Sequence, residues 1–253
     1  MVFLDTTEHL SRRYDEQIRW HPMLRSYTKL RRYAEAVKDA GAEGYIWGFI
    51  DGHFMGFRRP TVDQRTYYSG HYKAHGLKLQ GIVTPDGLIA SLEGPFFGKD
   101  NDWSIYQNSR IPHRIERMMK RPSKTGQPRR LLYLYGDPAY SNACGIMCPF
   151  SHPEGFRFLS SNQQGFNKAM SSLRISVEHA IGAVFRNHTA TAFAASMSLG
   201  QQPVAAFYRV AALLSNCLTC IRGGNQTSQR YSISPPSLEE YLGFEATPSL
   251  WDT

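Results

Sequence analysis

The stretch YIWGFIDGHFMGFRRP, residues 45–60, decides how the fold of this chain is interpreted. It opens with aromatic and β-branched residues that show no helical period, which predicts a buried strand. We expect the strand to end at Asp51, because Asp-Gly is a common turn pair. A carboxylate at the end of a strand can also be a metal ligand, so Asp51 is either a turn residue or the first residue of a site.

A second apolar run, LLYLYGDPAY at residues 131–140, has the same character. Pro138 cannot donate a hydrogen bond to a sheet, so it marks the end of a short strand and places Asp137 at the C-terminal edge of that strand. Between the two runs, LKLQGIVT (77–84) and LIASLEGP (88–95) are joined by a Pro-Asp-Gly turn, which predicts an antiparallel hairpin.

Helical patterns precede and follow these strands. Residues 7–40 predict two helices that are separated at His21-Pro22, with Gly41 as a C-cap. The segment FNKAMSSLRISVEHAIGAVFRN (166–187) has apolar residues at helical spacing, with Asn167 as a candidate N-cap. Glu178 lies beside its apolar stripe, one turn after Arg174.

The last long helix is predicted from Pro203 to Gly223. It is the most apolar segment of the chain, but Arg209 and Asn216 interrupt it, which predicts a core helix rather than a membrane span. The four cysteines, at positions 144, 148, 217 and 220, would suit a zinc site in number. The second pair lies within this apolar helix, so we interpret it as part of the core.

Three carboxylates form a candidate site. Asp51 and Asp137 each follow a short apolar strand, and strand ends at one edge of a sheet can converge if the strands are neighbours. A helix packed on that sheet could bring in Glu178. Hard oxygen donors of this kind hold Mg2+ or Mn2+, and two such ions about 4 Å apart catalyse phosphodiester hydrolysis. Each acid alone has an ordinary explanation, as a turn, a loop or a helix ion pair, so the hypothesis depends on the three together.

The composition permits a large globular core and favours a polyanionic partner. Of 253 residues, 42% are hydrophobic, which is enough for one large domain or two small ones. Lysine and arginine exceed aspartate and glutamate by 29 − 21 = 8, a charge that attracts nucleic acid or an anionic membrane surface. The first residues carry acids too early for a secretory signal, so nothing here indicates an oxidising compartment.

At these positions the sequence resembles the DDE-superfamily endonucleases of the Harbinger (PIF) type, which are transposases and the nuclease-like proteins derived from them. The similar segments, which span about residues 45–242 in the family's order, are GFIDGHF, RPTVDQRTYYSGHYKAHGLKLQGIVTPDG, GPFFGKDNDW, LYGDPAY, FNKAMSSLRISVEHAIG, ALLSNCLTC and PPSLEEYL. The resemblance implies an α/β fold of the ribonuclease H-like type, with a mixed central sheet flanked by helices.

The resemblance also implies a catalytic, metal-binding triad of Asp51, Asp137 and Glu178, spaced by 137 − 51 = 86 and 178 − 137 = 41 positions. Two Mg2+ or Mn2+ ions would assist water to cut DNA and leave a 3′-hydroxyl, which a competent transposase then uses for strand transfer. Asp102 is a secondary metal candidate, although Asn101 replaces the histidine that the family tends to have before it. His53 replaces a small hydroxyl residue, which would either perturb the metal site or add a polar neighbour, and we favour the second.

Basic residues near these acids are candidates for DNA contacts. Three follow the first strand, seven lie in the most basic segment of the chain, and one lies on the helix of Glu178. They are Arg58, Arg59 and Arg65; Arg114, Arg117, Lys120, Arg121, Lys124, Arg129 and Arg130; and Arg174. The alternatives are charge compensation for the acids, a solvated surface or, through the sequence KRPSK, a nuclear-import signal.

We therefore expect a helical N-terminal extension at residues 1–44, a nuclease domain at 45–242 and a tail at 243–253. Family transposases usually carry a helix-turn-helix region ahead of the nuclease domain, so this chain resembles a truncated or domesticated copy. The implied partners are DNA, a separate Myb-like DNA-recognition protein and further copies of the chain, with no membrane. The expected location is the nucleus, or the cytoplasm until a partner binds. The rival hypothesis is a non-catalytic DNA-binding or interaction module derived from a transposase.

Overall fold

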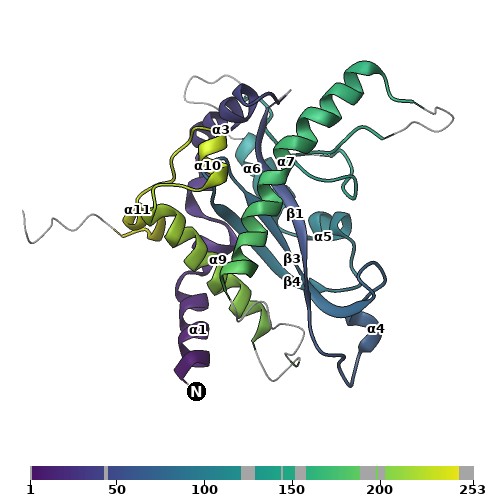
Figure 1. Cartoon of the computed structure of the whole chain (residues 1–253), viewed down its shortest axis with the longest axis vertical. Helices are drawn as coiled ribbons and strands as arrows, with labels where there is room; N and C mark the ends of the chain where they lie inside the picture. Colours follow the sequence, from purple (N-terminus) through teal and green to yellow (C-terminus); the bar gives the residue numbers. More distant parts are fainter. Residues whose placement is uncertain are drawn as a thin grey trace, which may run out of the picture.

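The computed structural model describes residues 2–42, 45–120, 129–143, 145–151, 158–188, 198 and 203–244. Within these ranges the centre of the molecule is a six-stranded sheet with the order β2-β3-β1-β5-β6, in which β4 also pairs with β3. Figure 1 shows helices in front of and behind this sheet. The strands are β1 (Ile46–Gly56), β2 (Tyr68–Ser69), β3 (Ala74–Val83), β4 (Ile89–Phe97), β5 (Tyr133–Tyr135) and β6 (Ile146–Met147).

The sheet combines two kinds of pairing. Strands β1, β3 and β4 are antiparallel neighbours, and the predicted hairpin is confirmed as β3 and β4. Strands β5 and β6 instead run parallel to β1 and to each other. This mixed α/β architecture, with a central sheet between helices, confirms the fold class and is consistent with the ribonuclease H-like fold of a DDE nuclease.

The expected end of the first strand at Asp51 is wrong. Strand β1 continues to Gly56, and Asp51 is paired with Gly81 of β3 in the middle of the ladder. Only the pairing with β5 stops early, at Phe49 and Tyr135. Asp51 therefore lies where β1 is paired with β3 alone and no longer with β5. The unpaired side of β1 forms an edge of the sheet at this point, and the sequence had placed Asp51 at such an edge.

One face of the sheet is covered by α7 (Ser161–Asn187) and α9 (Val204–Ile221). Their apolar side chains join those of Phe49, Met55 and Leu79 in one core cluster. The expected N-cap at Asn167 is wrong, because Ser160 and Gln163 form a capping box that starts α7 earlier. Asn167 lies inside the helix and hydrogen-bonds both backbone groups of Phe150, each at 2.9 Å.

The opposite face carries a second core cluster, to which α3 (Tyr27–Asp39) and α6 (Ile111–Lys120) contribute. The break expected near His21-Pro22 is a short 3-10 helix, η1 (Pro22–Arg25), and a further break separates α1 (Val2–Arg13) from α2 (Asp15–Arg19). Gly41 follows α3 with φ of 103°, as a C-cap glycine requires. The remaining helices are α4 (Gln64–Tyr67), α5 (Asp102–Asn108), α10 (Gln226–Arg230) and α11 (Leu238–Leu242).

Helix α9 is the one helix in the described part of the chain that is long and apolar enough to cross a membrane by length and composition. Such a helix is weak evidence for a membrane span, and 56% of it is buried inside the protein. It contains Cys217 and Cys220, which are free thiols, while Cys148 is a free thiol in the other core cluster. Cys144 lies outside the described residues.

Candidate active site

Asp51 points to the face of the sheet that α7 covers. Its Oδ1 accepts a hydrogen bond from the backbone N–H of Gly52 at 3.0 Å, and its Oδ2 lies 3.8 Å from Nη1 of Arg174 on α7. The side chains of Asp51 and Arg174 are only 22% and 23% exposed. The carboxylate is thus held in a partly desolvated position with one distant cation.

Asp137 follows β5 by two residues, as the sequence predicted. Its Oδ1 accepts a hydrogen bond from the N–H of Ala139 at 2.9 Å, a local turn that fixes the carboxylate beyond the strand. Burial raises the pKa of Asp137. The negative charge of Asp137 in turn contributes to a raised pKa at Asp51, so the two carboxylates lie within electrostatic reach of each other.

Asp102 reaches the same region from the other face of the sheet. It is the first residue of α5, whose N-cap is Asn101, with Oδ1 of Asn101 accepting from the N–H of Ser104 at 2.7 Å. One carboxylate oxygen of Asp102 accepts a hydrogen bond from Nζ of Lys78 at 3.0 Å. A Cβ at Gly52 would lie 2.6 Å from the Asp102 carboxyl carbon, so Gly52 leaves space for this side chain rather than making a turn.

Glu178 is connected to Asp51 through Arg174. Nη2 of Arg174 donates to Oε1 of Glu178 at 2.5 Å, and the glutamate side chain is 48% exposed. The guanidinium therefore lies between two of the three acids of the predicted triad. In the described part of the chain, no three residues of the types Asp, Glu, His and Cys are close enough to hold one metal ion.

The charges at the site are incompletely compensated. The pKa of Asp51 is raised to about 6, first by burial and then by the negative charges of Asp137 and Asp102, while Arg174 opposes the shift. A carboxyl group with a raised pKa beside other carboxylates is typical of functional sites and of places where a cation binds.

His53 lies two residues beyond Asp51 on the same strand face. Burial lowers the pKa of this histidine to about 4, so the imidazole is neutral at pH 7. Its ring centroid lies 6.1 Å from that of Tyr208 on α9. His53 is thus a neutral, partly buried polar neighbour of Asp51.

A family model described as DDE superfamily endonuclease matches residues 50–216. The chain belongs to this family. The matched segment is well over half of the chain and contains Asp51, Asp102, Asp137 and Glu178. No curated protein and no solved structure matches the chain.

DDE endonucleases generally use divalent metal ions, and the donor set suits such an ion chemically. Asp51 and Asp137 offer hard oxygen ligands of the kind that Mg2+ and Mn2+ prefer. The raised pKa of Asp51 indicates a place where an additional positive charge would be stabilising. Arg174 now supplies part of that charge and holds Glu178.

Sequence reasoning missed a group of polar residues that supports Asp102 in this DDE endonuclease. Nε2 of Gln80 donates to the carbonyl of Asp102 at 3.1 Å and to the hydroxyl of Tyr140 at 3.0 Å. Gln80 is fully buried and Lys78 is 8% exposed, on the same face of β3. The signal that could have identified Lys78 and Gln80 is their spacing, because they are two polar residues at alternate positions of a mostly apolar strand.

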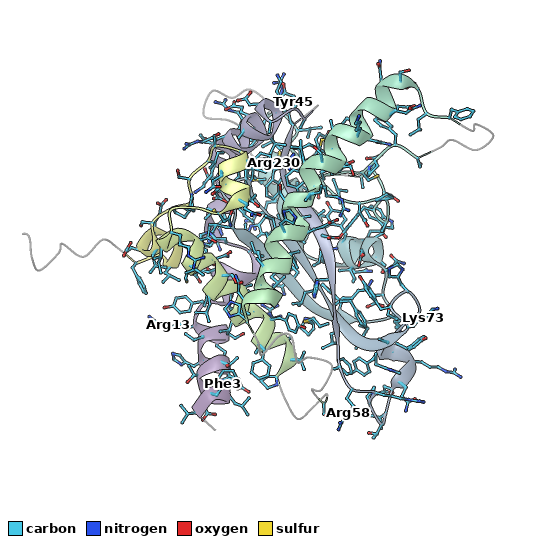
Figure 2. All side chains as sticks on the ribbon, in the orientation of Figure 1. Phe3, Arg13, Tyr45, Arg58, Lys73 and Arg230 are labelled. Carbon is cyan, nitrogen blue, oxygen red and sulfur yellow. The ribbon has the colours of Figure 1, made fainter. Side chains whose placement is uncertain are left out.

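Some of the predicted DNA-binding residues lie near opposite ends of β1. Tyr45 and Arg58, just outside the two ends of the strand, lie at the top and the bottom of the molecule in Figure 2. The guanidinium carbon of Arg130 lies 4.0 Å from the ring centroid of Tyr45, so Arg130 lies at the same end of β1 as Tyr45. Arg58 and Arg65 are exposed at the other end, where Arg59 donates to Oε1 of Gln64 at 2.6 and 2.9 Å.

Among the described residues, most of the candidate cations of the basic segment have protein partners. Nη1 of Arg114 pairs with Glu93 at 2.8 Å, and Lys120 pairs with Glu116 at 2.6 Å. Nη1 of Arg129 donates to a backbone carbonyl, that of Met118, at 2.9 Å. Arg121 and Lys124 lie outside the described residues.

Arg117 is exposed and carries no ion pair to a described residue. It lines a cavity of about 550 Å3 between α2 and α6, together with Arg19, Arg25, Arg110 and Arg114. Asp15 and Glu16 lie in the same lining, so the surplus of positive charge there is smaller than the sequence suggests.

Proposed function

We propose that this DDE endonuclease is of the Harbinger (PIF) type and cuts DNA with the help of a divalent metal, using Asp51, Asp137 and Glu178. The main support is that Asp51 and Asp137, 137 − 51 = 86 positions apart in the chain, lie close enough at the open side of β1 for the charge of Asp137 to help raise the pKa of Asp51. Glu178 faces the same place from α7 through its contact with Arg174. Asp102 is the fourth candidate acid, beside Gly52.

Asp51, Asp137 and Glu178 would hold Mg2+ or Mn2+, with Asp102 as a further ligand. When bound, the metal supplies positive charge for the reacting phosphate and lowers the pKa of water. The residues of the chain do the rest: Asp51 must be ionised, as it is above its pKa of about 6, and Glu178 must leave Arg174. The freed guanidinium of Arg174 is then placed to donate to a phosphate oxygen of the DNA.

DNA would lie along the end of β1 that carries Arg58, Arg59 and Arg65. The further candidate contacts are Arg114, Arg117, Lys120, Arg121, Lys124, Arg129 and Arg130. We infer a nuclease domain at 45–242, preceded by helices at 1–44 that complete its core and followed by a tail at 243–253. Action in the nucleus, strand transfer, self-association and a Myb-like recognition partner belong to the same proposal.

A second candidate function is a non-catalytic DNA-binding or interaction module. The observation that favours it is the ion pair of Arg174 with Glu178, which occupies one acid of the triad. A permanent pair of this kind would leave the protein able to bind DNA but unable to hold the metal in a cutting arrangement.

Plasmid nicking in Mg2+ distinguishes the two functions. The variants are Asp51→Asn, Asp137→Asn and Glu178→Gln. The matched control is Glu116→Gln, an exposed acid on α6 that pairs with Lys120. We expect the wild type and the control to nick supercoiled DNA and each triad variant to lose at least about 100-fold in rate, the scale of removing a group that stabilises a transition state. DNA binding without nicking by the wild type would support the second function, and equal nicking by all proteins would contradict the triad.

A further inference from the structure

Two aromatic rings are stacked at the surface beside the carboxylates. Phe54 on β1 and Tyr72, in the turn between β2 and β3, have ring centroids 4.4 Å apart and planes inclined by 7°. His71 meets Tyr72 edge-on at 4.8 Å and 83°. Tyr72 is 48% exposed although it is large and aromatic. The pair is thus an ordered stack with much of its outer ring open to solvent.

The stack adjoins the acidic site on the α5 side of the sheet. Phe54 follows Gly52 by two residues, so both are on the same face of β1, roughly 7 Å apart along the strand. The carboxylate of Asp102 lies over Gly52, and the Phe54 ring lies over Gly76 of β3. Burial raises the pKa of Tyr72, and the negative charges of Asp102, Asp51 and Asp137 add to the shift, so its hydroxyl lies within the field of all three acids.

The surroundings of the stack suit a nucleic-acid strand. From residue 57 to residue 75 the chain carries Arg58, Arg59, Arg65 and Lys73 against one acid, Asp63. Arg58 and Lys73 both project from the lower part of the molecule in Figure 2. Exposed aromatic rings next to phosphate-binding cations are how proteins hold single-stranded nucleic acid, because every base has a face that can stack.

We propose that Phe54 and Tyr72 form a platform that stacks an unpaired base of the DNA substrate, next to the phosphate that lies at the carboxylates. This inference rests on the proposed nuclease function and specifies its substrate class. A base inside a duplex is paired and is covered on both faces by its neighbours, so it cannot reach a protein ring. The preferred substrate is therefore DNA with an unpaired nucleotide beside the bond to be cut, such as a strand end, rather than continuous duplex.

Binding of the full chain to two DNA probes, without divalent metal, tests the platform. The probes are a single-stranded 12-mer that contains one 2-aminopurine and a blunt duplex of the same sequence. We expect tighter binding of the single strand, with quenching of the 2-aminopurine fluorescence. Tyr72→Ala and Tyr72→Leu should weaken single-strand binding by about 5- to 100-fold, the equivalent of losing one base–aromatic stack, and should abolish the quenching.

Two control variants keep the test specific. Tyr72→Phe preserves the ring and should bind and quench as the wild type does. Tyr68→Ala removes a 43% exposed tyrosine from the same hairpin, one whose ring meets His75 instead of Phe54, and should leave quenching unchanged. Thermal unfolding of each variant checks that it folds.

The proposal is overturned if Tyr72→Ala binds and quenches like the wild type, or if Tyr68→Ala loses as much as Tyr72→Ala does. It is also overturned if the wild type prefers the duplex. The assay contains no metal and needs no cleavage. A failure of the platform is therefore separate from a failure of the nuclease, which plasmid nicking by the wild type and by Asp51→Asn measures independently.

Discussion

The two faces of β1 hold their carboxylates in different ways. On the α5 side, Asp102 and Lys78 form a short pair of 3.0 Å with side chains 20% and 10% exposed, and Gln80 and Tyr140 complete the network. On the α7 side, Arg174 is 3.8 Å from Asp51 and shares its charge with the half-exposed Glu178. Asp102 is closely paired with its own cation, whereas Asp51 shares a more distant one with Glu178, and only the α7 side contains two acids of the proposed triad.

Removing Lys78 should have the largest effect on stability. Lys78→Met leaves the Asp102 carboxylate poorly exposed and without its cation, so we expect a loss of roughly 3 kcal/mol in the free energy of unfolding. Urea denaturation measures this loss. The double variant Lys78→Met with Asp102→Asn should recover much of it, because no uncompensated charge remains. If Lys78→Met costs less than about 0.5 kcal/mol, the two faces do not differ as described.

Neutralising Asp51 should stabilise the metal-free protein. The pKa of Asp51 is raised from 3.8 to about 6, so between these pH values the folded protein keeps a proton that the unfolded chain has released. The ionised Asp51 therefore lowers stability progressively as pH rises from about 4 to about 6. We expect Asp51→Asn to exceed the wild type by roughly 2 kcal/mol at pH 7.5, because a shift of about 2 pKa units at about 1.4 kcal/mol each is reduced by solvent screening at this partly exposed carboxylate.

The difference in stability between Asp51→Asn and the wild type should depend on pH, and this dependence tests the role of the charge more directly than the difference at a single pH. The gain from Asp51→Asn should shrink as pH falls from 6 and disappear near pH 4, where the wild-type carboxyl group is also neutral. Urea denaturation at several pH values in the presence of a chelator provides the measurement. A gain of equal size at pH 4 and pH 7.5 would show that the charge of Asp51 is not its cause.

Replacing Arg174 should change the free energy of unfolding less than the Lys78 and Asp51 variants do. Its clearer effect should be on the affinity for a divalent metal. Arg174→Gln breaks a pair that is partly exposed and a contact at 3.8 Å, so we expect a loss of about 1 kcal/mol or less. The same change removes the cation that competes for Asp51 and Glu178, so Mn2+ should bind about 3- to 10-fold more tightly at pH 8, the scale of a coupling of about 1 kcal/mol. Calorimetric titration with Mn2+ measures it, with Arg117→Gln as an exposed control that should bind Mn2+ as the wild type does.

The sequence predicted well what depends on local pattern. The β3–β4 hairpin followed from the Pro-Asp-Gly turn, and the place of Asp137 followed from Pro138. The early end of β1 was wrong because Asp-Gly resembles a turn, whereas Gly52 serves to admit Asp102. That contact joins residues 50 positions apart, since 102 − 52 = 50, and no local pattern in the chain encodes it.

The sequence indicates the acids of the candidate site more directly than the contacts of the cations around them. Asp51 and Asp137 are recognisable because each comes after an apolar, aromatic run, and Glu178 because it lies beside the apolar stripe of a helix. The dual role of Arg174 depends on how α7 crosses β1, and the pair of Lys78 with Asp102 depends on how α5 packs on β3. Arg114 and Arg129 of the basic segment have protein partners, which a count of charges does not reveal.

In the proposed function, Glu178 leaves Arg174 and joins Asp51 and Asp137 at a divalent metal. The most direct measurement is Mn2+ binding by the wild type, Asp51→Asn, Asp137→Asn and Glu178→Gln, with Glu116→Gln as the control. We predict saturable binding by the wild type and the control, and at least about 10-fold weaker binding by each triad variant, the scale of losing one ligand. Binding by Glu178→Gln that equals the wild type would contradict the claim and leave Glu178 as a partner of Arg174 alone.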